Sequence, residues 1–327
     1  MNPMKKGLLF LSTLLTGFSF GQTADCSELF ISEYVEGWSN NKALEIYNPT
    51  ANSIDLSQYF VARYNNGSTS NTSGATTSIA IQLTGTIAPY STHVGVIDKR
   101  DPMGTGQEAP VWDSLQARAD AFYCPVYADS YAFYWNGNDA VVLAKGSASD
   151  IANSVVVDIF GKIGQDPGTA WTSAFPYNGP GDIVTADHSM IRKAAIKKGE
   201  TNVLLSFFDP LLEYDSIPAV VDIGGQLYGN WFSLGDHTCD CESATVNEEY
   251  VEAVKVYPNP TNGIIYVKNI ASFDEIDITN ALGQSVYSTS TNGKSVMYVD
   301  LSSSKGVYFV KLTNAEGEQL SKRVVVK

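Results

Sequence analysis

Basic residues are scarce in this chain, and their scarcity excludes one large class of partners. The 327 residues include 21 Lys and Arg against 35 Asp and Glu, which gives a formal net charge of −14. The charge becomes −16 without the first 21 residues, which carry Lys5 and Lys6 and no acid. A field of this sign repels phosphate backbones and anionic membranes. Nucleic acid is therefore an unexpected partner.

Recognisable catalytic patterns are also missing. The sequence contains no G-x-S-x-G and no H-E-x-x-H, the patterns that place a nucleophile or a pair of zinc ligands in many hydrolases. The three histidines, His93, His188 and His237, share no ligand spacing, and an isolated histidine is more often structural than catalytic. We therefore expect a protein that is not an enzyme and carries no cofactor, calcium being the one exception considered below.

Long apolar runs are absent except at the N-terminus. There, Lys5 and Lys6 precede an uncharged run over residues 7–24, which includes LLFLSTLL and small residues around Gly21. This layout predicts a secretory signal peptide over residues 1–21, cleaved before Gln22. The alternative is a membrane anchor, but threonines and a glycine dilute the run and no basic flank follows it. No transmembrane segment is expected after cleavage.

Cysteines are few and even in number. All four, Cys26, Cys124, Cys239 and Cys241, follow the predicted signal peptide, so they are expected in an oxidising compartment as two disulfides. Three connectivities exist, and two remain if a strained bond between Cys239 and Cys241 is excluded. The alternative is a metal site, because His237, Cys239 and Cys241 occupy alternate positions and would share one face of a strand.

What the chain does contain favours an all-β fold. It has 27 Gly, 18 Tyr and 14 Phe and only 17% charged residues, a composition that suits short strands joined by turns. Residues 29–35 and 42–47 read as strands around the loop 37–41, and the period of two in residues 42–47 predicts a half-buried strand. Asn136-Gly137, between two apolar runs, predicts a hairpin, and residues 111–122 allow one short helix.

The C-terminal part predicts a second, smaller unit. From Val256 onward, apolar stretches alternate with turn signals such as Asn262-Gly263, Asn292-Gly293 and Glu316-Gly317. This pattern indicates a separate β-sandwich of about 70 residues. Residues 242–255, which are rich in charge, are expected to form the linker that precedes it.

Eight short motifs in the main part of the chain carry a resemblance to a known family. They are FISEYVEG (30–37), NKALEIYNPT (41–50), IDL (54–56), NGNDAVVL (136–143), VDIFGKIG (157–164), DPGTAW (166–171), IRK (191–193) and NWFSLGDHTC (230–239). With these motifs, residues 22–241 resemble the secreted bacterial form of the lamin tail domain. The resemblance implies an immunoglobulin-like β-sandwich, with insertions at residues 65–78 and 98–126, which do not match.

Four further motifs occur in order in the C-terminal part. They are VYPNPTNG (256–263), ITNALGQSVY (278–287), GVYFVKL (306–312) and KRVVVK (322–327). Residues 256–327 thereby resemble the C-terminal sorting domain of type IX secretion, a route across the outer membrane of certain Gram-negative bacteria. The resemblance implies that the secretion machinery recognises this domain, that the domain is usually removed, and that the protein is released or attached to the cell surface.

Two sets of candidate site residues follow from the main part of the chain. Exposed aromatic rings on β-sandwiches can stack on sugars, so we expect the polar loop with Trp38, flanked by Glu36 and Asn40, to bind an extracellular glycan or protein. Carboxylates can bind calcium, and the candidates are Glu33, Glu45, Asp139 and Asp158. The alternative for these four is that they lie at solvated strand edges or cap turns.

The expected function is therefore that of an exported, non-catalytic binding or adhesion protein. Two alternatives remain open from the sequence. One is an accessory or unrecognised secreted hydrolase, associated with nucleases or phosphoesterases, and the other is a purely structural component of the cell envelope.

Overall fold

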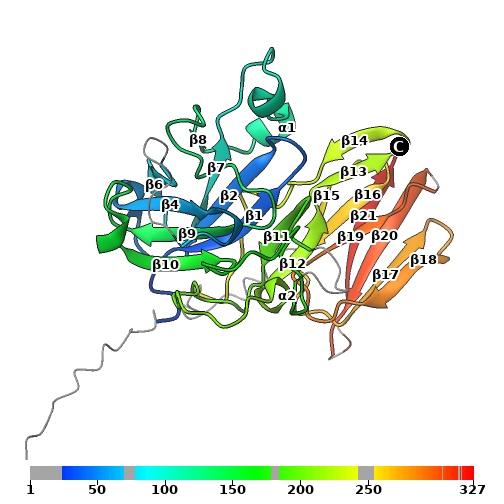
Figure 1. The fold of residues 1–327 in the computed structure, drawn as a ribbon. Coiled ribbons are helices and arrows are strands. Elements are labelled where there is room, and N and C mark those ends of the chain that lie inside the picture. The colour runs from blue at the N-terminus through cyan, green and yellow to red at the C-terminus, as the bar shows by residue number, and fades with distance from the viewer. Residues whose placement is uncertain are drawn as a thin grey trace, which may run out of the picture.

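The computed structural model describes residues 24–69, 78–177, 184–241, 254–303, 305–315, 317 and 319–327. The predicted signal peptide and nearly all of the predicted linker lie outside the described residues, as does most of the predicted insertion at 65–78. Figure 1 shows two β-rich units, the first coloured blue to yellow-green and the second yellow to red. No helix in the described part of the chain has the length and apolar character that crossing a bilayer requires.

The first unit is a sandwich of two main sheets. The six-stranded sheet has the order β12 (Tyr214–Pro218), β11 (His188–Arg192), β1 (Phe30–Glu36), β2 (Lys42–Asn48), β7 (Ser91–Ile97) and β8 (Ala121–Tyr123). The four-stranded sheet has the order β10 (Val155–Phe160), β9 (Ala140–Lys145), β4 (Tyr59–Tyr64) and β5 (Ala80–Gln82). Two short pairs complete it, β3 (Ile54–Asp55) with β6 (Thr86–Ile87) and β13 (Val220–Ile223) with β14 (Gln226–Gly229). The all-β, immunoglobulin-like sandwich is thus confirmed.

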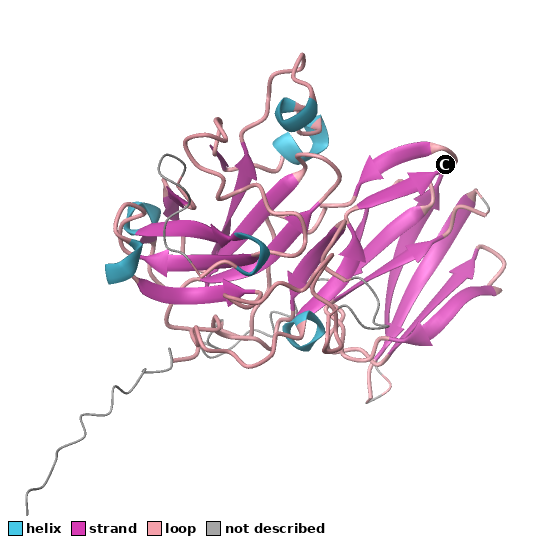
Figure 2. Ribbon diagram, in the orientation of Figure 1, coloured by secondary structure: helices cyan, strands magenta, loops and turns pink. Residues whose placement is uncertain are grey.

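Helices are short and peripheral, as Figure 2 shows. The α-helices are α1 (Asp113–Gln116) and α2 (Pro210–Glu213), and the 3₁₀ helices are η1 (Leu56–Gln58), η2 (Asn65–Gly67), η3 (Gly106–Glu108) and η4 (Ile151–Asn153). The helix expected within residues 111–122 is only one turn long, because the chain enters β8 at Ala121 and pairs with β7.

The hairpin predicted at Asn136-Gly137 is wrong. Strand β9 begins at Ala140, and the aromatic run before it, from Tyr131 to Trp135, is not a strand. Trp135 instead lies in the core, where its indole N–H donates to the carbonyl oxygen of Val35 at 2.9 Å. Burial of the large rings between the two sheets therefore outweighs the local turn preference of the Asn-Gly pair.

Strand β2 also departs from its prediction, because both of its faces are buried. All seven residues of β1 and all seven of β2 are buried. One face of these strands packs toward the four-stranded sheet, where the rings of Tyr34 and Phe160 stack at 4.1 Å. The other face holds Glu33 and Glu45 and is covered by the segment around Ser233 and Gly235, whose groups bond these carboxylates.

The second unit is the small sandwich that the turn pattern predicts. One sheet has the order β15 (Lys255–Tyr257), β16 (Ile264–Lys268) and β19 (Val296–Asp300). The other has the order β18 (Ser285–Ser290), β17 (Glu275–Asn280), β20 (Gly306–Thr313) and β21 (Gln319–Val326). Its core is separate from that of the first unit and contains Ile265, Ile276, Val310 and Val324.

The two units pack against each other. Ile191 of β11 and Ile217 of β12 form one apolar cluster with Tyr266 of β16 and Val296 of β19. The backbone N–H and hydroxyl of Ser295 both donate to Asp215, at 3.2 and 3.0 Å. Figure 1 shows β15 and β16 beside β11 and β12, consistent with these contacts.

Candidate functional site

The loop between β1 and β2 presents one large exposed ring on a fixed backbone. Trp38 is 44% exposed. Its carbonyl oxygen accepts from the side-chain amide of Asn41 at 2.7 Å, and the amide oxygen of Asn41 accepts from the backbone N–H of Trp112 at 2.9 Å. A Cβ on Gly37 would lie 2.8 Å from the carbonyl oxygen of Asn41, so only glycine fits this close turn.

Glu36 and Asn40 support this loop and do not lie exposed beside Trp38. Asn40 is buried, and its amide donates to the carbonyl oxygens of Gln107 and Ala109 at 2.9 and 2.7 Å. Glu36 is buried in an ion pair with Lys42 and also accepts from the backbone N–H of Asp187. Burial raises the pKa of Glu36. Within the predicted binding set, Trp38 is the residue whose side chain is available to a ligand.

The four predicted calcium ligands do not converge. Among the described residues, no group of three or more His, Cys, Asp or Glu side chains could hold a metal ion. Asp139 is buried against Arg63, 2.8 Å from its Nε, and also accepts from the backbone N–H of Asn66 at 3.2 Å. The carboxylate of Asp139 is thus engaged by an arginine and a backbone N–H group.

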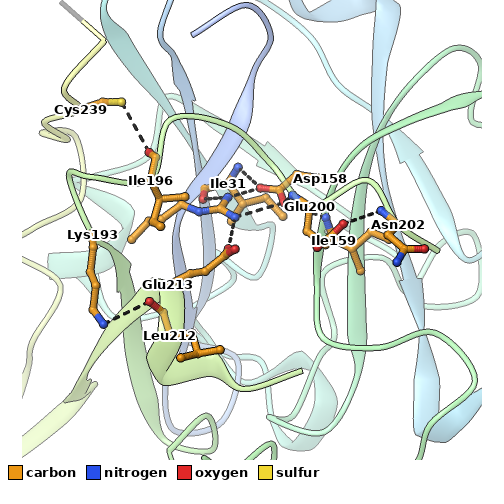
Figure 3. Close-up of polar contacts among 11 residues, drawn as sticks. Ile31, Asp158, Ile159, Lys193, Ile196, Glu200, Asn202, Leu212, Glu213 and Cys239 are labelled. Carbon is orange, nitrogen blue, oxygen red and sulfur yellow. Dashed lines mark hydrogen bonds and ion pairs between the residues drawn. The ribbon is translucent and has the colours of Figure 1, made fainter. Parts of the chain in front are cut away.

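Asp158 belongs to a buried ion-pair network, drawn in Figure 3. Its carboxylate pairs with Arg192 and accepts backbone N–H groups of Ile31, Ile159 and Glu200, each at 2.8 Å. Arg192 also pairs with Glu213 at 2.5 Å. Asp158 lies in β10, whereas Ile31 and Arg192 lie in β1 and β11, so its carboxylate joins the two main sheets.

Glu33 and Glu45 do lie together, directly opposite each other in β1 and β2. Glu33 accepts from the hydroxyl of Ser233 at 2.9 Å, and Glu45 accepts from the hydroxyl of Ser32 at 2.7 Å and from the backbone N–H of Gly235. Burial raises the pKa of Glu33 from 4.5 to about 8, with a further rise from the Glu45 charge. Burial also raises the pKa of Glu45.

The buried lysine whose charge acts on both acids was not predicted from the sequence. Lys268 of β16 is buried, and its ammonium lies 3.8 Å from a carboxylate oxygen of Asp236. The charge of Lys268 acts against the burial that raises the pKa of both Glu33 and Glu45. Lys268 lies more than 200 positions from both acids in the sequence. The only pattern in the sequence that bears on its burial is its position in a strand of mostly apolar residues.

The cysteines form one of the expected pairings. Cys26 and Cys241 are joined in a disulfide, whereas Cys124 and Cys239 are buried free thiols. The expectation of two disulfides is therefore wrong. Cys124 lies near Ser130 of the first unit, 3.6 Å from its hydroxyl, while Cys239 lies near Ile196 and Cys241. His237 packs edge-on against the rings of Phe30 and Tyr47, as a structural residue would.

Comparisons with known proteins agree with this architecture. Residues 22–158 match the family model of the lamin tail domain, and residues 255–327 match that of the secretion system C-terminal sorting domain. The first match ends before β11 and β12, which complete the six-stranded sheet in this structure. No curated protein matches the chain.

Among solved structures, one similar chain is described as PorZ, an essential bacterial surface component of the type-IX secretion system of Porphyromonas gingivalis. The identity is 11% and the TM-score 0.22, over 59% of this chain and 36% of that one. This chain therefore spans little more than a third of that protein's length.

Proposed function

We propose that this secreted protein, which combines a lamin tail domain with a C-terminal sorting domain of type IX secretion, is a non-catalytic binding protein. It acts outside the cell or attached to the outer-membrane surface, and it binds an extracellular glycan or protein through Trp38. The single observation that carries the proposal is an exposed indole held on a loop whose polar groups are already bonded within the protein.

The rigidity of the loop supports a binding role. Asn40 and Asn41 anchor both sides of the turn to the segment that includes Gln107, Ala109 and Trp112. An aromatic ring on a backbone that is already ordered loses little conformational entropy when it contacts a ligand. Indole rings also offer a large flat apolar surface, which suits the face of a sugar or an apolar patch of a protein.

The contacts of the histidines support a role without catalysis. His93 bonds the hydroxyl of Tyr123 at 3.0 Å, and His188 bonds the carbonyl oxygen of Ala186 at 2.7 Å. His237 is buried between two rings, and burial lowers its pKa well below 6.5. Each imidazole is thus engaged in packing or in a local bond, whereas a histidine that acts as a general base must lie within reach of the proton it removes.

The proposal is tested by binding of the purified chain to insoluble cell-surface polysaccharide and to immobilised envelope proteins. Trp38→Ala should weaken binding about tenfold, in the range expected for an aromatic anchor. The matched control is Phe175→Ala, since Phe175 is an exposed ring of the same domain. Unchanged binding by Trp38→Ala would exclude this site, and turnover of glycans or phosphoesters would exclude a purely binding role.

A further inference from the structure

An open groove lies along the junction of the two units, near β12 and β19 in Figure 1. One part is a hollow of about 440 Å³, lined mainly by residues 215–217 and 296–300. The other part is a hollow of about 550 Å³, whose lining includes Lys193 and residues 292–294. Asp215, Ser216 and Lys294 line both hollows, so the two are continuous. We call them together the junction groove.

Both walls of the junction groove carry a strand edge. In the described part of the chain, β12 is an outer strand of the six-stranded sheet and β19 an outer strand of the three-stranded sheet. Antiparallel pairing turns the backbone groups of alternate residues toward the neighbouring strand. The backbone N–H of Ala219 bonds on the β11 side and that of Leu301 on the β16 side. Ser216 and Tyr298, each three positions earlier, therefore point their N–H and C=O groups away from their own sheets.

The edge of β19 lacks the residues that usually keep a free strand from pairing. Lysine and proline commonly protect outer strands. Strand β19 reads VMYVD and has neither, and Tyr298 in its middle is 45% exposed. By contrast β21, an outer strand of the other sheet in the second unit, carries Lys322 and Arg323. The β19 edge is thus open to an added strand.

The charges of the groove favour an acidic ligand, although the chain as a whole is acidic. Asp215 is the carboxylate that both hollows share, and it accepts from the backbone N–H and hydroxyl of Ser295. Burial raises the pKa of Asp215, and the bonds from Ser295 and the charges of Lys193 and Lys294 act against that rise. Two ammonium groups therefore face one carboxylate there, and Lys294 is exposed to a ligand.

We propose that the junction groove binds an extended acidic segment of a partner protein, which adds a strand to β19 and places a carboxylate beside Lys294. The free backbone edge supplies the pairing, and Tyr298 offers an apolar surface to a side chain of the added strand. The ligand class follows from the combination of a strand edge with excess positive charge. The groove shares no lining residue with the Trp38 loop and does not depend on the function proposed for Trp38.

The first test measures binding of a fluorescent hexapeptide of alternating glutamate and valine to the complete chain by anisotropy. Lys294→Glu should weaken binding about tenfold, because it reverses a charge beside the ligand. The matched control is Lys305→Glu, which makes the same change at an exposed lysine of the second unit outside the groove. The control should bind like the wild type. Equal binding by the wild type and Lys294→Glu would overturn the proposal.

The second test asks whether the peptide pairs as a strand. Two versions of the hexapeptide are compared, one methylated on the backbone nitrogen of every valine and the other on that of every glutamate. Because alternate residues of an added strand donate to the edge, at least one version should bind about tenfold more weakly than the unmethylated peptide. Undiminished binding by both versions would overturn the proposal.

The remaining controls distinguish the peptide from other occupants. Trigalacturonate, an acidic glycan without a peptide backbone, should not displace the hexapeptide, and sedimentation should show a monomer at the concentrations used. Displacement by trigalacturonate would assign the groove to acidic glycans. A dimer that Lys294→Glu dissociates would assign it to a second copy of the chain. Either result would overturn the proposal.

Discussion

Glu33 holds a carboxyl group in a buried position opposite Glu45, and this makes stability depend on pH. Its pKa is about 8 in the folded protein and near 4.5 when exposed. Between these values the folded state binds more protons than the unfolded state, so the free energy of unfolding falls as pH rises from about 4.5 to about 8. Glu33→Gln, which stays neutral and can accept from Ser233, should flatten that dependence.

The size of this effect is measurable by urea unfolding at pH 5 and pH 8. The wild type should lose on the order of 3 kcal/mol over this window through Glu33, and Glu33→Gln should lose clearly less. Asp55→Asn is the control, because Asp55 is exposed and caps η1 locally. A pH dependence identical in the wild type and Glu33→Gln would contradict this account of the buried carboxyl.

Asp158 and Glu213 neutralise the same buried arginine but should contribute unequally. Asp158→Ala removes the fully buried partner of Arg192 and the acceptor of three backbone N–H groups, so it should cost about 3–5 kcal/mol. The side chain of Glu213 is 34% exposed, so water can reach it and partly replace its interaction with Arg192. Glu213→Gln should therefore cost less than half as much as Asp158→Ala. Chemical denaturation measures the free energy of unfolding of both variants. Equal losses of this free energy would contradict the expected effect of burial.

At the scale of elements, the Cys26–Cys241 disulfide joins the segment before β1 to the segment that follows β14, the last strand of the first unit. The two cysteines are 215 positions apart, and in the chain-entropy model such a closed loop stabilises the fold by about 5 kcal/mol. Cys26→Ser should therefore lower the melting temperature, whereas Cys124→Ser, which removes a free thiol, should do so far less.

Peptide mapping without reduction checks the pairing itself. We expect one linked peptide pair, containing Cys26 and Cys241, and alkylation of Cys124 and Cys239 only after unfolding, because both thiols are buried. Burial raises the pKa of Cys239 to about 11, which further slows its reaction as a thiolate. A linked pair of Cys26 with Cys239 would show that the alternative connectivity forms.

At the scale of the whole molecule, we expect export to depend on the C-terminal sorting domain. Deletion of residues 256–327 should trap the protein in the periplasm, as measured by cell fractionation and immunoblotting. Lys268→Gln keeps the sorting domain and alters only its contact with Asp236, so this variant should still be exported. Normal appearance of the deletion variant outside the cell would contradict the role of the sorting domain.

Much of the fold could be predicted from local patterns. The period of two in residues 42–47 located β2, and the glycine turns of the C-terminal part located a separate sandwich, because turn geometry and side-chain alternation are short-range properties. The same short range explains the wrong hairpin at Asn136-Gly137: the burial of Trp135 against Val35 involves residues 100 positions apart. No local pattern reports such a contact.

The candidate site also combines features that follow from local sequence with features that follow from contacts between distant residues. By itself, the sequence determined the two-domain architecture, the exported class and the exposure of Trp38, since each depends on composition or on neighbouring residues. Only the tertiary structure decided that Asp139 and Asp158 pair with arginines, that one disulfide forms rather than two, and that Glu33 and Glu45 are buried beneath Ser233 and Gly235. Charge compensation and burial depend on which distant segments meet, and that is a property of the folded chain.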